Sequence, residues 1–184
     1  MNSLNFLGFL LLAIVIQHSA INGHNNAELE RQPSDTKQGL RLPVEIDRKI
    51  VRMNDAVKAK IRLANVSPSP ITIYKEFGWG PSSSFTSTIT DMAKKVILST
   101  TFPDAQDRPP FIVEQFITIQ PGKSLELERW LDIRSEGIKV PGEYKYTIWY
   151  HSPVSLEFAP SGMEIWPMEN GDLESKPITF KVIK

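Results

Sequence analysis

The sequence contains no cysteine, and this absence excludes several kinds of protein at once. Without a thiol there is no disulfide, no thiolate metal ligand and no cysteine nucleophile. A chain of 184 residues must then be stabilised by an apolar core, which its length allows. Histidine is also scarce, because only His151 lies in the region that we expect to fold.

An excess of charge of either sign is also missing, since 21 basic and 21 acidic side chains cancel. A protein that binds nucleic acid or an anionic membrane through charge needs a basic patch. We therefore expect neither as a partner. Histidine and carboxylates do not cluster at zinc spacing, and the acidic segments lack the spaced pattern of a calcium loop, so we expect no metal and no cofactor.

A hydrophobic run of membrane-spanning length is absent too. The apolar stretch at residues 6–16 is shorter than the roughly 20 residues that a bilayer requires. Small residues follow it, so we interpret residues 1–23 as a secretory signal peptide that ends at Ala20 or Gly23, the alternative being an uncleaved anchor. Residues 24–39 are polar and predict a flexible leader. This organisation predicts a secreted or periplasmic protein whose folded domain spans residues 40–184.

A sustained helical period is absent from the rest of the chain, whereas alternation of apolar and polar residues recurs throughout it. Successive side chains of a strand point to opposite faces, so alternation predicts half-buried strands. The candidate strands are residues 43–51, 56–64, 70–75, 85–89, 95–99, 111–119, 125–133, 144–151 and 177–183. We expect 56–64 and 70–75 to form a hairpin, because a turn rich in serine and proline joins them.

Two proline-glycine pairs, at Gly122 and Gly142, each precede an alternating run. We expect both pairs to form turns that start strands, which gives these glycines a structural role. Many short strands separated by proline and glycine are typical of a sandwich, the alternative being a barrel. The sequence predicts an all-β, antiparallel β-sandwich of about seven to nine strands.

The stretch from Pro141 to Tyr146 resembles the start of the F strand in immunoglobulin-like and fibronectin-type domains. The resemblance implies that the Tyr144 hydroxyl bonds back to the chain in a tyrosine corner. Tyr146 stands where an antibody-type domain carries its second cysteine. The chain is therefore similar to the cysteine-free Ig-like sandwiches of exported proteins, including the small intracellular-proteinase-inhibitor type, over roughly the last third of the domain.

Aromatic side chains in the long connections are the candidate contacts. Trp79 lies in a glycine- and serine-rich loop between Phe77 and Phe85, where it either stacks on a sugar or a protein surface or closes the end of the sandwich. Trp166 lies in the connection 153–176, which either covers a sheet or binds a partner.

Trp149 is expected on the opposite face of its strand from its aromatic neighbours. Tyr144, Tyr146, Ile148 and Tyr150 share one face of the strand, and Trp149 lies on the other. We expect the aromatic face to be partly exposed, as a docking surface or beneath the following connection.

Few residues could support catalysis. A hydrolase would need His151 beside Ser152 or Ser155, and adjacency in the sequence does not supply that geometry. The carboxylates of the late connection are expected to be solvated; they are Glu164, Glu169, Asp172 and Glu174.

We therefore expect a non-catalytic monomer that binds a protein or a carbohydrate outside the cytoplasm through its long loops. The alternative is an inhibitor of a secreted peptidase that presents residues 102–111, a loop that Pro109 and Pro110 stiffen. A hydrolase that uses His151 is a third candidate. The motif at Asn65 matches a glycosylation acceptor but precedes Pro68, which leaves its use open.

Overall fold

The computed structural model describes residues 35–75, 77, 84–100 and 111–184. All of them lie in the second of two units of the chain, Arg31–Lys184. The predicted signal peptide and residues 24–34 of the predicted leader lie outside the described part of the chain.

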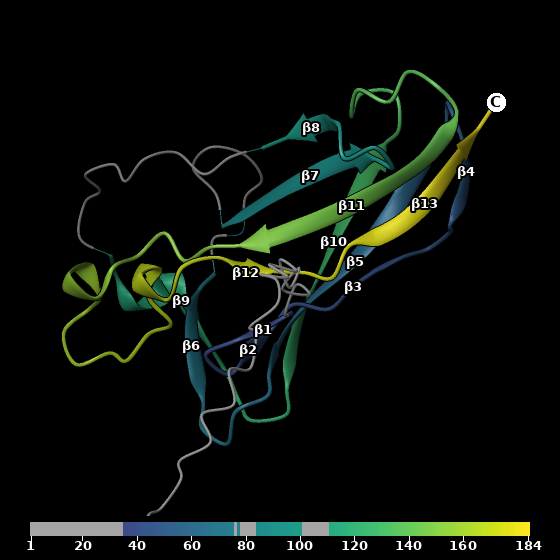
Figure 1. The fold of residues 1–184 in the computed structure, drawn as a ribbon. Coiled ribbons are helices and arrows are strands. Elements are labelled where there is room, and N and C mark those ends of the chain that lie inside the picture. The colour runs from purple at the N-terminus through teal and green to yellow at the C-terminus, as the bar shows by residue number, and fades with distance from the viewer. Residues whose placement is uncertain (1–34, 76, 78–83, 101–110) are drawn as a thin grey trace, which may run out of the picture. The chain divides into compact units, whose positions relative to one another are not determined.

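Three sheets make up the described domain, two large and one small (Figure 1). The first contains β1 (Thr36–Lys37), β2 (Leu40–Arg41), β3 (Val44–Ile46), β5 (Ala56–Asn65) and β10 (Ser124–Asp132). The second contains β4 (Ile50–Arg52), β7 (Phe85–Asp91), β8 (Val96–Ser99), β11 (Gly142–Tyr150), β12 (Leu173–Glu174) and β13 (Ile178–Ile183). The third pairs β6 (Ile71–Tyr74) with β9 (Phe116–Ile119). The predicted all-β sandwich is confirmed, with thirteen strands among the described residues.

One apolar core lies between the two large sheets, and the alternation in the sequence places its members. Val57, Ile61 and Leu63 of β5 point inward, while the lysines between them face solvent. On β11 the inward residues include Tyr146 and Ile148, neither of which is exposed. Burying apolar surface contributes about 25 cal/mol per Å², so this shared interior is what stabilises a chain without disulfides.

The predicted strand at 43–51 is in fact two strands that belong to different sheets. β3 pairs antiparallel with β5, whereas β4 pairs parallel with β13. The chain changes sheets between them, at residues 47–49, where Asp47 accepts a hydrogen bond from the backbone N–H of Lys58. The predicted leader also ends early, because β1 already pairs with β2 and the side chain of Asp35 is bonded to Arg41.

The predicted hairpin between residues 56–64 and 70–75 is wrong. β5 pairs with β10 along its whole length, from Ala56 opposite Asp132 to Ala64 opposite Ser124. β6 instead pairs with β9 in the small sheet. The turn that joins β5 to β6 therefore carries the chain from one sheet to another.

Asn65 holds that turn. Its amide nitrogen donates to the backbone oxygens of Ser69 and Ile119, both at 2.8 Å, and its amide oxygen accepts from the N–H and the hydroxyl of Ser67. The residue is 1% exposed. A glycan on this nitrogen would displace a bond that joins the turn to β9, so the folded domain uses the acceptor motif as a structural element.

Replacing Asn65 with alanine is expected to lower the free energy of unfolding by about 2 to 4 kcal/mol, because it leaves buried backbone groups without partners. Val66→Ala in the same turn removes a side chain that is 53% exposed and should change stability by less than about 0.5 kcal/mol. Urea denaturation of both variants measures the difference. Equal stabilities would show that the turn does not depend on the Asn65 side chain.

The two proline-glycine pairs have different structures. Pro121-Gly122 forms a turn in which Gly122 has a φ of 71°, a value that favours glycine, and Lys123 N–H donates to Gln120. Pro141-Gly142 is not a turn, because Gly142 is already paired with Val182 as the first residue of β11. A Cβ at Gly142 would lie 3.6 Å from the Tyr144 ring.

Tyr144 makes the bond that the Ig-like resemblance implies. Its hydroxyl donates to the backbone oxygen of Val140 at 2.7 Å. Burial is the main reason that its pKa is raised, with the nearby charge of Asp91 acting in the same direction. The ring therefore ties the start of β11 to the preceding connection.

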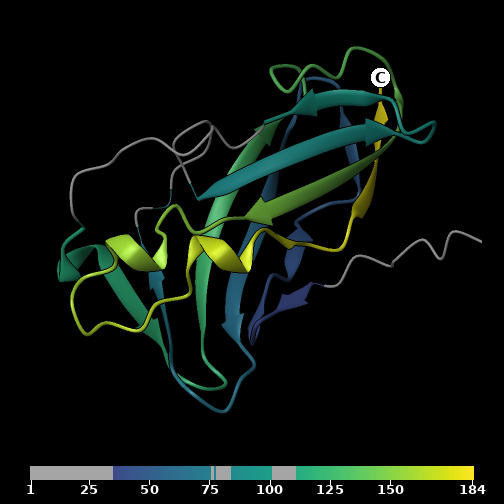
Figure 2. The same ribbon diagram turned by 60° about the vertical axis from the view of Figure 1, so that its left-hand side comes forward.

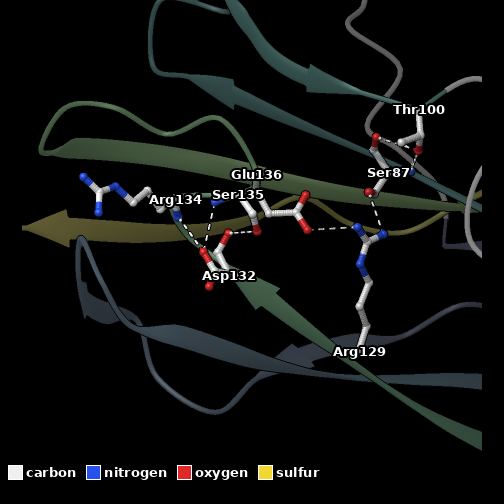
Figure 3. A network of polar contacts seen from close by, with 7 residues as sticks. All are labelled: Ser87, Thr100, Arg129, Asp132, Arg134, Ser135 and Glu136. Atoms are coloured by element: carbon white, nitrogen blue, oxygen red, sulfur yellow. Dashed lines mark hydrogen bonds and ion pairs between the residues drawn. The ribbon is translucent and has the colours of Figure 1, made fainter.

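An inward-pointing arginine connects the two large sheets (Figure 3). Arg129 of β10 donates to the Ser87 hydroxyl of β7 at 3.1 Å and pairs with Glu136 at 3.1 Å. The side chains of Arg129 and Glu136 are only 14% and 12% exposed. β10 is an edge strand of the first sheet, so this cluster bonds that edge to β7 of the second sheet.

The turn after β10 brings Glu136 to Arg129. Asp132 accepts hydrogen bonds from the backbone N–H groups of Arg134 and Ser135, also visible in Figure 3. The Ser135 bond is the largest cause of the lowered pKa of the Asp132 carboxyl. The ionised form of Asp132 therefore favours this turn.

Glu136→Gln is expected to lower the free energy of unfolding by about 1 to 3 kcal/mol, because Arg129 would lose the opposite charge of Glu136 in a largely desolvated place. Glu128→Gln is the matched control, since Glu128 pairs with Lys58 at the surface and should matter by less than about 1 kcal/mol. Thermal and chemical denaturation compare the two. A Glu136→Gln variant as stable as the parent would mean that the inward pair does not stabilise the domain.

Candidate functional site

Long connections leave the domain at one end, which the strand register defines. Phe85 begins β7 opposite Tyr150, the last residue of β11. In the small sheet, Tyr74 ends β6 opposite Phe116, the first residue of β9. The connections 75–84, 100–115 and 151–172 all start or end at these positions. We call the described residues 111–116 and 151–171, together with Tyr74, the loop end.

The loop end has a small core of its own. The Tyr74 ring meets the rings of Phe111 and Phe116 edge-on, with centroids 5.4 Å and 5.8 Å away. Val154 is completely buried in the same cluster. A backbone bond from Trp166 N–H to Thr72 joins the connection to β6, and a second from Met168 N–H to Val154 links two parts of the connection itself. The loop end is therefore a packed platform.

Four apolar side chains project from this platform into solvent. They are Ile112, Val113, Leu156 and Phe158, which are between 48% and 57% exposed. They lie on or beside two short 3₁₀ turns, η1 (Val113–Gln115) and η2 (Leu156–Phe158). Both views of the ribbon place these turns and η3 (Met168–Asn170) together at the same end of the described domain (Figure 2).

Side-chain hydrogen bonds hold both turns in place. The Gln115 amide oxygen accepts from the Ile112 N–H at 3.0 Å, and the Glu169 carboxylate accepts from the Leu156 N–H at 3.2 Å. The exposed side chains are thus mounted on a fixed backbone, which lowers the entropy that a partner must remove on binding.

Two of the predicted contact residues belong to the main core. Phe85 is fully buried with its centroid 5.3 Å from Tyr150, and Trp166 is 4% exposed at 5.5 Å from the same ring. A large aromatic ring can be buried wherever a facing residue covers it, and the sequence alone does not show which residues face each other. As contacts for a partner, Phe85 and Trp166 are corrected to core residues.

The other residues of the predicted aromatic loop are only partly described. Phe77 is half-buried and packs against the main core, 5.8 Å from the Phe85 ring. Trp79 lies outside the described residues, so its role stays a prediction.

The aromatic face of β11 is not exposed, although the sequence predicted that it would be partly exposed. Tyr144, Tyr146 and Tyr150 all point into the core and are at most 2% exposed. Trp149 is half-buried on the outer face, opposite Glu174 of β12. Burial raises the pKa of Glu174, and a hydrogen bond from the Trp149 side chain acts in the opposite direction. The connection 153–176 both covers and exposes apolar residues, since Trp166 is buried and Phe158 is not.

The histidine and its neighbouring serines have distinct surroundings. His151 Nδ1 lies 2.9 Å from an Asp172 oxygen. Ser152 is fully buried and its hydroxyl is 3.4 Å from the backbone oxygen of Val154, while Ser155 is 4% exposed. Neither serine is therefore accessible to a substrate.

Metal-ligating side chains do not gather in the described structure. Among the residues for which placement is given, no three or more histidines, cysteines, aspartates or glutamates come together as metal ligands. Within the same residues, no helix has the length and apolar character needed to cross a bilayer.

The Tyr150 hydroxyl is buried at the base of the loop end, without a hydrogen-bond partner among the described residues. Burial raises its pKa. Burial likewise raises the pKa of Tyr146 to about 12. Because these folded pKa values lie above the ordinary value near 10, the stability that depends on protonated tyrosine is complete below pH 10 and is lost as pH rises above it.

The free energy of unfolding is expected to fall above pH 10, by about 1.4 kcal/mol per pH unit for each buried tyrosine. Tyr150→Phe should make this fall less steep, because it removes one ionisable group. Urea denaturation at several pH values, with tyrosinate absorbance followed in parallel, measures both effects. An unchanged slope in Tyr150→Phe would mean that Tyr150 ionises as readily in the folded state as in the unfolded one.

Sequence reasoning missed Ile112, Val113 and Leu156 of the loop end because it gave most weight to aromatic rings. The available signal was the apolar pairs inside otherwise polar connections, such as Ile112 with Val113. It also missed Trp130, which is 60% exposed on the outer face of β10 and lies 5.8 Å from the Lys58 ammonium. The parity of Trp130 with Glu126 and Glu128 would have placed it on that face.

Comparisons with known proteins relate the chain to solved structures only. No protein-family description matches the chain, and no curated protein does. The chain is similar to the C-terminal domain of wzt at 11% identity and a TM-score of 0.43, over 81% of this chain and 77% of that domain. It is also similar to the CARDB domain of PF1109 from Pyrococcus furiosus, at 8% identity and a TM-score of 0.36, over 78% of this chain and 91% of that one.

A third similar structure is the alkylpurine DNA glycosylase AlkC of Pseudomonas fluorescens, with 10% identity and a TM-score of 0.38. The match covers 78% of this chain and 29% of the glycosylase, so this chain spans less than a third of that enzyme.

Proposed function

We propose that this chain is an exported, non-catalytic β-sandwich module that binds a protein partner at the loop end. The observation that carries the proposal is the set of four large apolar side chains, Ile112, Val113, Leu156 and Phe158, held in solvent on a platform with its own core. Large apolar side chains gathered in solvent at one end of a domain are typical of interaction sites.

The mounting of these side chains favours recognition. Protein interfaces depend on a few anchors that become fully desolvated in the complex. The Leu156 N–H donates to the Glu169 carboxylate, and the Phe158 N–H donates to the backbone oxygen of Ser155 at 3.1 Å. A partner therefore gains apolar contact with little loss of conformational entropy in these turns.

The chemistry of the surface favours a protein over a carbohydrate. Sugars are recognised largely by flat aromatic rings, and the tryptophan of this connection, Trp166, is buried. Branched aliphatic side chains such as Ile112, Val113 and Leu156 fit the apolar pockets of a protein surface better.

A peptidase is one partner of this class, and inhibition is the second candidate function. Residues 102–110 of the loop predicted to enter a peptidase lie outside the described structure. Its last residue, Phe111, is anchored in the small core, and the exposed Ile112 and Val113 follow directly. This anchoring supports a loop that is presented from a fixed base.

Export is part of the proposal and rests on the sequence of residues 1–23. The apolar stretch 6–16, the small residues after it and the lack of cysteine support a secreted or periplasmic protein. The sparse catalytic groups and the buried Ser152 and Ser155 support a non-catalytic role.

The double change Leu156→Ser with Phe158→Ser is expected to abolish capture of the partner from the extract of the host, because it removes two anchors without touching the core. The measurement is affinity capture with full-length protein, followed by identification of proteins retained at matched bait concentration. Partner proteins retained by the unmodified chain should be missing from the double variant.

Ile50→Ser is the matched control, since Ile50 is 62% exposed on β4 and belongs to no part of the loop end. It should retain the same proteins as the unmodified chain. Both variants should keep the melting temperature and β-rich circular dichroism of the parent. Equal capture by a folded double variant would refute binding at the loop end.

A further inference from the structure

The described segments of the loop end carry charge of one sign only. Residues 111–116 and 151–171 contain the acidic side chains Glu114, Glu157, Glu164 and Glu169, and neither lysine nor arginine. The whole chain, by contrast, has a formal net charge of zero. The loop end is therefore an acidic region in a chain whose charges cancel overall.

Several charged side chains of the domain have close partners of opposite charge. On the outer face of the first sheet, Lys58 pairs with Glu128 at 2.7 Å, Lys60 with Glu126 at 2.9 Å, and Arg62 with Glu45. Glu114, Glu157 and Glu164 have no ion-pair partner among the described residues. Glu169 bonds the backbone of Leu156.

The acidic and apolar side chains alternate along the same turns. Glu114 directly follows Ile112 and Val113 in η1, and Glu157 stands between Leu156 and Phe158 in η2. Apolar side chains and carboxylates are thus sequence neighbours on both exposed turns. A partner surface that complements both must be apolar and basic.

We infer that the loop end binds a protein segment in which lysine or arginine side chains are interspersed with large apolar ones. This inference rests on the proposed function and specifies its partner. The apolar side chains of the segment contact Leu156, Phe158, Ile112 and Val113, while its cations lie against Glu114 and Glu157. The carboxylates contribute to the rate of association and to the choice of partner, and the apolar anchors contribute most of the affinity.

The same charge pattern argues against a membrane surface as the occupant. Peripheral binding to anionic lipids combines apolar side chains with lysine or arginine. Carboxylates beside the apolar anchors would be repelled by such a surface. Vesicles containing anionic lipid therefore make a negative control for the same site.

The test measures binding of three synthetic peptides of equal length to the full chain by fluorescence anisotropy. One alternates lysine with leucine, one lysine with serine, and one glutamate with leucine. We expect the lysine-leucine peptide to bind most tightly, with an affinity that weakens as salt is raised, because exposed charges are screened.

Glu114→Gln with Glu157→Gln is expected to weaken binding of the lysine-leucine peptide by about three- to tenfold, since each exposed charge contributes modestly. Leu156→Ser with Phe158→Ser should abolish it. Glu143→Gln changes an exposed carboxylate at the start of β11 and is the control for loss of charge. It should leave the affinity unchanged.

Three outcomes would overturn the inference: tighter binding of the glutamate-leucine peptide, equal binding of the lysine-serine peptide, or no binding of the lysine-leucine peptide. Binding of anionic vesicles through Leu156 and Phe158 would overturn it as well. None of these results decides the proposed function, which fails only if the folded Leu156→Ser and Phe158→Ser variant still captures the partner. The two ideas are thus tested separately.

Discussion

Strand β11 is the constraint on which the other parts of this domain depend. It pairs with β7 on one side and with β12 and β13 on the other. Its inward side chains fill the interior at the middle of the second sheet, and removing any of them would leave a cavity beneath several strands. The Tyr144 hydroxyl bonds the start of β11 to the preceding connection, and the ring of its last residue, Tyr150, packs against Trp166 at the loop end. The same strand therefore links the main core to the surface where we place binding.

The sandwich and the loop end are stabilised differently. In the sandwich, a buried hydrogen bond from Asn65 joins the turn after β5 to β9. The ion pair between Arg129 and Glu136 lies partly desolvated between the two large sheets. The loop end relies instead on a small aromatic core and on backbone bonds. Separating these supports allows Leu156 and Phe158 to stay exposed without weakening the sandwich. Residues chosen for recognition can then vary while the core is unchanged.

The strands that alternate cleanly could be predicted from the sequence, and those that cross between sheets could not. Residues 56–64, 125–133 and 144–151 each present one buried face, so their parity alone assigns inward residues such as Ile61 and Tyr146. The division of 43–51 into β3 and β4, and the pairing of β6 with β9, depend on partners far away in the chain. Local alternation identifies a strand but carries no information about its neighbour.

By itself the sequence determined that the protein is built of strands, that it has no disulfides and which side chains share a face, because these properties follow from local composition and the two-residue period. Only the tertiary structure decided what each face meets. Phe85 and Trp166 are core residues because other rings cover them, whereas Leu156 and Phe158 are exposed because none of the packed elements reaches them. Exposure is a property of the assembled chain, and for this reason the candidate site could be recognised only once the sheets were in place.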